Sequence, residues 1–211
     1  MGRPLGAPHE QAQQTRVLRS ALNLLERTDG PVILDDFPEE APRATAQEMD
    51  GMFCPLPAAR PAAAAEGDLM AAVTAEVGSL RPWHVLAQQR QQGRTTVGSS
   101  GLSLDDALGF LGQVLQGQDP SLPNPALDAG QTLRLSALDL RTWYLEAAVA
   151  RPGANPSSVV MSEWFWGETA AGQLLLAIYD AATDHPNRKV RREAKLTLIP
   201  RREWHRLNTV P

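Results

Sequence analysis

The chain has 211 residues, of which 43% are hydrophobic and 21% are charged, and its net charge is −4. A chain of this length folds as one domain, or as one domain with an appended arm, and it buries about 70% of the surface that its unfolded form exposes. The small net charge argues against a polyanion or a membrane surface as the partner of the whole molecule, and the single cysteine, Cys54, excludes an intramolecular disulfide and any multi-cysteine metal site.

The first third of the chain contains one predicted helix and a long connector. Hydrophobic residues recur at helical spacing over residues 9–28, and Asp29–Gly30 ends this helix. Residues 31–34 are a short apolar run that could form a strand. Prolines recur between about residues 35 and 67, which predicts a connector with at most a short helix near residues 45–52.

Two further helices are predicted before residue 120. The first covers residues 68–92, with Asp68 as its N-cap and a break at Arg81–Pro82, because proline removes a backbone donor and clashes with the preceding turn. The Gly-Ser-Ser-Gly sequence of residues 98–101 predicts a turn, and Ser103 then caps the next helix.

The strongest helical pattern lies in the last third of the chain. A helix around residues 138–149 carries apolar residues on both sides, which places it at the centre of the fold. A long helix is predicted from about residue 158 to about residue 182, as its antiparallel neighbour. Residues 196–199 are ambiguous and could pair as a strand with residues 32–34.

These elements together predict a mostly α fold, an irregular multi-helix bundle with at most a minor two-stranded β element. We expect a single helical domain over residues 1–211. The Pro/Ala-rich connector occupies residues 35–67 of it, and a basic C-terminal segment occupies residues 188–206.

The long helix predicted over residues 158–182 carries a carboxyl group on its apolar face. Trp164 falls in a narrow arc with several aliphatic residues, and Glu168 lies in the same arc one turn later. A carboxylate among apolar neighbours has a raised pKa unless a cation pairs with it, and such groups often serve as acids or bases. Glu168 is therefore a candidate functional residue.

Two interpretations of Glu168 remain open at this point. In the first, Glu168 is the polar group of a ligand pocket lined by Trp143, Trp164 and Tyr179. In the second, it forms a structural ion pair with an arginine such as Arg141 or Arg151, since structural pairs also perturb pKa values.

Trp166 and the basic C-terminal segment are the candidate interaction residues. Trp166 follows Trp164 by two positions, so a continuous helix turns it outward, where another part of the chain covers it or it anchors a partner. The segment 188–206 has eight positive residues against two negative ones. The positive residues are Arg188, Lys189, Arg191, Arg192, Lys195, Arg201, Arg202 and Arg206. This segment could contact nucleic acid, or dock on the acidic remainder of its own chain or of a second copy.

Other groups of polar residues give weaker signals. The acidic cluster of residues 35–40 lacks the spacing of a calcium loop. Residues 98–101 could present backbone donors to a phosphate, but the acidic pair Asp105–Asp106 in the following helical turn would repel it. A three-histidine site from His84, His185 and His205 has no support in spacing. No metal and no cofactor is predicted.

Three hypotheses about function follow from these features. The leading one is a non-enzymatic protein–protein interaction or self-association module. The second is a small-ligand-binding protein or an enzyme with the Trp-lined pocket around Glu168, and the third is nucleic-acid binding through the basic segment, which no known motif accompanies. The chain shows no signal peptide and no run long enough to span a bilayer, so we expect a cytoplasmic location and no membrane partner.

Overall fold

A computed structural model of the chain describes residues 10–30, 32, 34–39, 68–150 and 158–207. The fold is mostly α, as predicted, and none of these residues forms a strand. The chain divides into two compact units at residues 49 and 50, inside the segment predicted as a connector. The short helix predicted near residues 45–52 lies outside the described residues.

The N-terminal unit contains one helix followed by a short helical turn. Helix α1 spans Gln11–Asn23, and a 3-10 turn, η1, spans Leu24–Glu26. Gly30 then adopts a φ of 82°, in the left-handed region that favours glycine, which agrees with the predicted end of this helix. Arg16 pairs with Glu39 at 2.7 Å, and this ion pair joins the helix to the segment that follows it.

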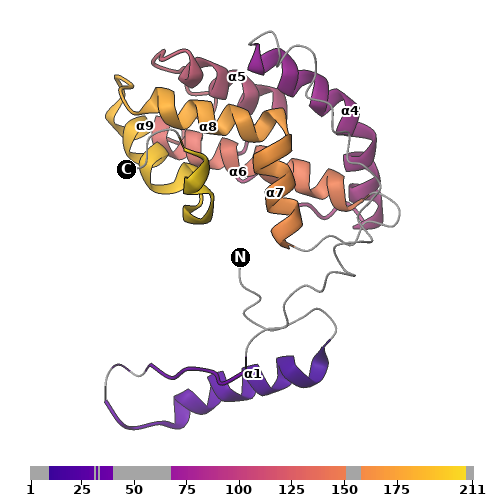
Figure 1. Cartoon of the computed structure of the whole chain (residues 1–211), viewed down its shortest axis with the longest axis vertical. Helices are drawn as coiled ribbons and strands as arrows, with labels where there is room; N and C mark the ends of the chain where they lie inside the picture. The colour runs from indigo at the N-terminus through magenta and orange to yellow at the C-terminus, as the bar shows by residue number, and fades with distance from the viewer. Residues whose placement is uncertain (1–9, 31, 33, 40–67, 151–157, 208–211) are drawn as a thin grey trace. The chain divides into compact units, whose positions relative to one another are not determined.

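The second unit is built from helices around a common core (Figure 1). Its elements are α4 (Leu69–Arg90), α5 (Leu104–Leu115), α6 (Ala129–Val149), α7 (Ser158–Glu168), α8 (Ala170–Ala182), α9 (Arg188–Glu193), the π-helical η2 (Ala194–Leu198) and the 3-10 helix η3 (Arg201–Arg206). Helix α6 packs against α4, α5, α7, α8, α9 and η2, so the prediction that it is central is confirmed.

The apolar character of α6 is uneven around the helix. Leu133, Leu140 and Tyr144 are fully buried, on the face that meets the other helices. Leu138 and Val149, predicted to form a second apolar face, are 39% and 43% exposed. That second face is covered only in part, and this leaves room for the pocket described below.

The predicted break of α4 at Arg81–Pro82 is wrong, because the helix runs through Pro82 without interruption. Proline deprives the carbonyl of residue 78, four positions earlier, of its helical donor. Gly78 and Pro82 are both exposed, so water can bond that carbonyl. Buried residues before and after the proline, such as Val77 and Ala87, hold both halves of the helix against the core.

The single long helix predicted over residues 158–182 is also wrong, since Thr169 divides it into α7 and α8, which meet at a sharp bend (Figure 1). Thr169 has extended backbone angles, with a φ of −90° and a ψ of 148°. Its hydroxyl donates to the carbonyl of Phe165 at 2.6 Å and accepts from the N–H of Gly172 at 3.0 Å. The side chain therefore closes the end of α7 and caps the start of α8.

The possible strand pairing of residues 196–199 with residues 32–34 is not seen among the described residues of these runs, none of which forms a strand. Residues 194–198 form the π-helical turn η2, in which Leu198 is buried. Val32 and Leu34 are 81% and 96% exposed and have no ladder partner. Packing of η2 against α6 and α8 decided the conformation of this ambiguous run.

Candidate functional site

The predicted inward position of Glu168 is wrong. Glu168 is the last residue of α7 and is exposed, at the point where the chain turns into Thr169. It forms no ion pair with Arg141, and Arg151 lies outside the described residues. Trp164 is buried as predicted, with 4% of its surface exposed.

The aromatic residues predicted to line a pocket with Glu168 belong to the packed interior. Trp143 stacks on His84 with ring centroids 4.8 Å apart, and Trp164 lies 6.3 Å from Tyr144. Tyr179 is 4% exposed. None of these residues lines the pocket described below. Glu168 is exposed whereas the three aromatic side chains are buried, so the polar group predicted for that Trp-lined pocket does not lie with them in the interior.

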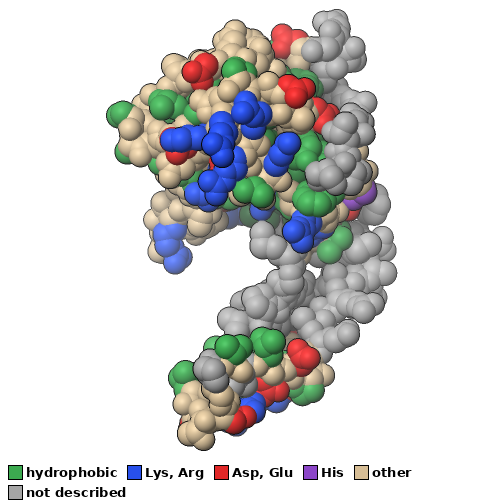
Figure 2. Space-filling model, turned by 90° about the vertical axis from the view of Figure 1, so that its left-hand side faces the viewer, with side chains coloured by type: hydrophobic (Ala, Val, Ile, Leu, Met, Phe, Trp, Pro, Cys, Tyr) green, Lys and Arg blue, Asp and Glu red, His purple; other side chains and the backbone are tan. Residues whose placement is uncertain are grey.

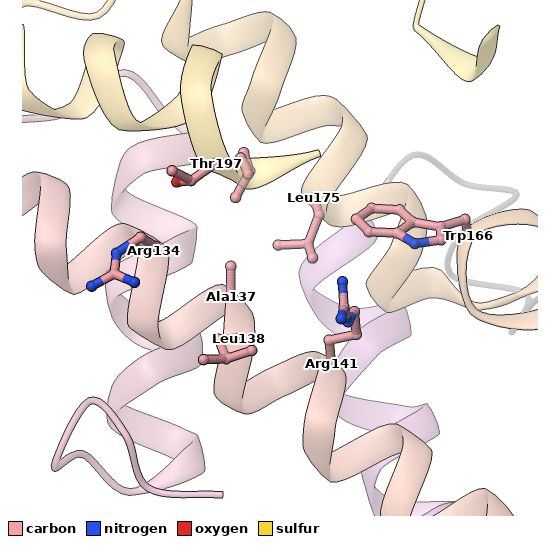
Figure 3. A pocket seen from close by; sticks show the side chains of 8 residues that line it. Arg134, Ala137, Leu138, Arg141, Trp166, Leu175 and Thr197 are labelled. Carbon is pink, nitrogen blue, oxygen red and sulfur yellow. The ribbon is translucent and has the colours of Figure 1, made fainter. Parts of the chain in front are cut away.

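Trp166, predicted to point outward, is 1% exposed. The bend at Thr169 folds α8 back against α7, so this indole lies between helices instead of on a free helix face. Its ring meets the edge of Phe165 at 5.1 Å, and its carbonyl accepts a hydrogen bond from Gln173 at 3.3 Å. One border of the indole faces a pocket (Figure 3).

This pocket has a volume of about 230 Å³ and lies between α6, α7, α8 and η2. Its lining residues are Arg134, Ala137, Leu138, Arg141, Trp166, Leu175, Thr197 and Leu198. Arg134, Leu138 and Arg141 share one face of α6 because residues four and seven positions apart align on a helix. The guanidinium of Arg141 points to the gap between Leu175 and Trp166 (Figure 3).

The electrostatics of the pocket are unbalanced. Arg141 is half-buried, yet it has neither a hydrogen bond nor an ion pair with any residue that the structure describes. Burial lowers the pKa of Arg141, the nearby charge of Arg202 lowers it further, and Glu203 opposes both effects. A desolvated cation without an anion is costly, so this side chain needs an explanation beyond packing.

The carboxylate whose charge acts on Arg141 is that of Glu203, and it is already hydrogen-bonded to other residues. Glu203 is 1% exposed and accepts hydrogen bonds from Ser162, Arg202 and Arg206 at 2.8, 3.0 and 2.9 Å. Burial would raise the pKa of Glu203, but the bonds from Arg206 and Ser162 and the charges of Arg202 and Arg206 outweigh it and lower that pKa. Its hydrogen bonds are taken up by these partners, so Glu203 acts on Arg141 through its charge alone and not through a hydrogen bond.

The basic residues predicted as interaction candidates divide into paired and unpaired groups. Lys189 pairs with Asp128 at 3.2 Å, Arg191 donates to backbone carbonyls, and Arg201 lies over the ring of Trp204 at 5.6 Å. Arg188 and Arg192 are exposed and have no ion pair within the described ranges.

Lys195 of η2 and Arg134 of α6 are also exposed, and neither has an ion pair with a residue that the structure describes. Figure 2 shows lysine and arginine side chains gathered on one face of the helical unit. This face is the side that carries α9 in Figure 1. Helix α9 and η2 both pack on α6. We call the cations of these three elements that have no ion pair among the described residues the basic face; they are Arg134, Arg188, Arg192 and Lys195.

The buried carboxylate of this fold is Glu76 on α4, not Glu168. Glu76 is 9% exposed and accepts hydrogen bonds from the N–H of Ala170 at 2.8 and 2.9 Å and from the hydroxyl of Tyr144 at 3.0 Å. It thereby satisfies the free donors at the start of α8 from a distant helix. Burial raises the pKa of Glu76, and the hydrogen bonds from Ala170, Tyr144 and Ala171 oppose that shift without cancelling it.

We expect the stability contributed by Glu76 to fall as pH rises. A carboxyl whose pKa is higher in the folded state than its ordinary value of 4.5 favours folding most when protonated, below that pH. This contribution is lost as pH rises through the folded pKa. Urea unfolding of wild type and Glu76→Gln from pH 4.5 to neutral measures this change in the free energy of unfolding. The amide does not titrate, and the two proteins have all their other carboxyl groups in common, so the difference between them reports Glu76.

In that comparison wild type should lose stability relative to Glu76→Gln as the pH increases. Parallel profiles for the two proteins would contradict the raised pKa. Glu76→Ala should be destabilised by about 2–4 kcal/mol at pH 4.5, where the contribution of Glu76 is largest, because it leaves buried donors without an acceptor.

The weaker candidate sites are accounted for by internal partners. The N–H groups of residues 98–100, considered as a phosphate site, all donate to the carboxylate of Asp139 on α6. His84 lies 3.2 Å from Glu146, and both ring nitrogens of His185 have backbone partners. His205 contacts the carbonyl of Arg202 at 2.9 Å. The three histidines therefore do not converge, and no cluster able to hold a metal occurs among the described residues.

The acidic cluster of residues 35–40 is described up to residue 39. Within it, Asp35 pairs with Arg27 at 3.3 Å and Glu39 with Arg16, so two of its carboxylates already have cations of their own unit.

Sequence reasoning missed Arg134, Glu76 and Asp139. Glu76 could have been suspected, because it lies among Val73, Val77 and Leu80 at helical spacing and thus on a buried stripe. No local sequence pattern predicts that residues of α6 and Trp166 line the same pocket. No described helix has the length and apolar character needed to cross a membrane. Comparisons with protein-family models, curated proteins and solved structures find no match.

Proposed function

We propose that this protein is a non-enzymatic interaction protein that associates with a second copy of itself through the N-terminal helix α1. The observation that carries the proposal is an uncovered apolar face on this helix. Leu18, Leu22 and Leu25 are 50%, 61% and 81% exposed, and they lie at the spacing of one helix face. Exposed apolar patches of this kind mark interaction sites.

The length of α1 supports the need for cover. It has 13 residues, followed by a single 3-10 turn. Helices shorter than about 12–15 residues are marginal in water unless an apolar face is packed. Within its own unit, Gln13 is buried and Val17 is half-buried, whereas Leu18, Leu22 and Leu25 of the leucine face are exposed.

Charge complementarity argues that a second copy of the chain covers the leucine face of α1. The N-terminal unit carries exposed acidic residues, including Glu26 and Asp36. The basic face of the helical unit carries the unpaired cations Arg134, Arg192 and Lys195. Two copies can satisfy both surfaces reciprocally in a symmetric dimer, a low-cost route to self-association.

Sedimentation equilibrium of the full chain tests this proposal. We expect a concentration-dependent dimer that Leu22→Glu disrupts, since burial of a leucine stabilises by roughly 1.5–3 kcal/mol and each 1.4 kcal/mol is tenfold in the dissociation constant. The matched control is Ser20→Glu, which adds the same charge on another face of the same helix and should leave the dimer intact. The double variant Arg192→Glu with Lys195→Glu should weaken it.

A strict monomer at high concentration would overturn self-association. A monomer in which the leucine face is protected from solvent would mean that the chain's own helical unit covers it.

Nucleic-acid binding through the basic face is a second candidate function. It is supported by Arg188, Arg192 and Lys195, which have no anionic partner in the described structure. A fluorescently labelled duplex oligonucleotide at low salt distinguishes the two functions. Self-association predicts no binding. Salt-sensitive binding that Arg192→Glu with Lys195→Glu removes would favour nucleic acid.

A further inference from the structure

The pocket between α6, α7, α8 and η2 has three properties that internal packing does not use. Its wall includes the half-buried guanidinium of Arg141, which has no hydrogen bond or ion pair to an anion in the part of the chain that the structure describes. Its border includes the indole of Trp166, whose N–H donates to no described group. The rest of its lining is mainly aliphatic.

The two donors lie on the same side of the pocket. Figure 3 shows the guanidinium of Arg141 directed to the space beside the indole of Trp166, with Leu175 next to both. Arg134 lies at the other end of the pocket, and its guanidinium points away from Trp166 and Arg141. An acidic group placed beside Arg141 could accept from both donors, and its other end would then lie over the aliphatic wall.

The charges around the pocket favour an anion from outside. The nearest carboxylate, Glu203, is held by Ser162, Arg202 and Arg206. Arg202 adds positive charge near Arg141. A guanidinium in this setting gains most from a carboxylate or phosphate, which it can bind through two parallel hydrogen bonds.

The volume limits the size of the ligand. About 230 Å³ is several times the roughly 30 Å³ that one water molecule occupies in the liquid. It is below the range of about 300–1,000 Å³ that is typical for pockets of drug-sized ligands. An acid with one ring or one branched aliphatic group fits this range.

We propose that this pocket binds a small organic anion, a carboxylate or phosphate monoester joined to an apolar group, with the acidic group held by Arg141 and the indole N–H of Trp166. The apolar group rests on Leu138 and Leu175. This site is separate from the leucine face of α1 and does not depend on self-association.

Titration of uniformly ¹⁵N-labelled full chain with benzoate and with phenyl phosphate tests the site. The indole N–H signals of the tryptophans are followed by NMR, and Trp166→Phe identifies the signal of Trp166. We expect a saturable shift of that signal with at least one of the two acids. Benzamide, which has the same ring without the charge, should bind at least tenfold more weakly.

Substitutions locate the anion. Arg141→Met should weaken binding at least tenfold, whereas Arg81→Met, which removes an exposed arginine outside this pocket, should leave it unchanged. Leu138→Asp gives a second route, because this residue is 39% exposed and tolerates a polar side chain, yet its carboxylate would repel the ligand. Its matched control is Leu122→Asp, at a loop position that is 43% exposed.

Several results would overturn the proposal. Failure of both acids to shift the Trp166 signal saturably would remove the site, as would unchanged affinity in Arg141→Met and Leu138→Asp. Inorganic phosphate binding as tightly as phenyl phosphate would show that the apolar wall is not used. Repeating the titration in Leu22→Glu separates the two proposals, since the pocket should bind benzoate or phenyl phosphate equally well when α1 cannot associate.

Discussion

Gly172→Ala is expected to destabilise the protein by about 3 kcal/mol or more, as a clash with rigid backbone does at the upper end of overpacking effects. A β-carbon at this position would meet the carbonyl oxygen of Phe165 at 2.1 Å and the Cα of Trp166 at 2.9 Å. Both contacts are with the last turns of α7, so relief requires the two helices to move apart. Urea unfolding of the full chain measures the loss.

The sign of this effect is informative because helix propensity predicts the opposite. Alanine is favoured over glycine inside a helix by about 1 kcal/mol. Gly109→Ala in α5 is the matched control, since this glycine is exposed and its added β-carbon meets nothing within 4 Å. The control should be stabilised by about 0.5–1 kcal/mol. Equal responses of the two variants would contradict the close approach of α7 to Gly172.

Asp139→Ala is expected to cost about 3 kcal/mol or more. The carboxylate is 3% exposed and accepts from the N–H groups of Gly98, Ser99 and Ser100 at 3.0, 2.9 and 2.9 Å, and from the Ser100 hydroxyl at 2.6 Å. Alanine would leave the buried N–H and hydroxyl of Ser100 unsatisfied, and each buried unsatisfied donor costs about 1–3 kcal/mol. Hydrogen exchange of the same amides should accelerate.

The control for Asp139→Ala is Asp105→Ala in the first turn of α5. Asp105 is exposed, and its carboxylate stabilises α5 only by interacting with the helix dipole, which contributes about 0.3–1 kcal/mol. A loss for Asp139→Ala no larger than that of Asp105→Ala would show that the turn of residues 98–101 does not depend on the carboxylate.

Asp139 also explains why the turn of residues 98–101 does not resemble an open phosphate site. Its backbone donors do point at an anion, as the glycine-rich sequence allows. That anion is a side chain of α6, forty or so residues away in sequence. The chain thereby fixes the segment that leads into α5, and the donors have no capacity left for a ligand.

The sequence by itself determined the elements whose signals are local. Asp68 and Ser103 cap helices in the structure as predicted, since each side-chain oxygen accepts from a backbone N–H three residues on. The mostly α fold and the central position of α6 followed from hydrophobic periodicity, which needs only neighbouring residues to be read.

Tertiary structure alone decided the features that depend on distant partners. Pro82 stays within α4 because the core holds both halves of that helix, and the bend at Thr169 is stabilised by Glu76, which accepts from the N–H of Ala170, 94 residues later in the chain. That bend ends α7 at Glu168, which is exposed there, and brings α8 against Trp166, so that the indole is buried beside the pocket that Arg141 also lines. Helical angle relates side chains only while a helix is continuous, so the predicted arc that joined Trp164 and Glu168 to the apolar residues of α8 does not form.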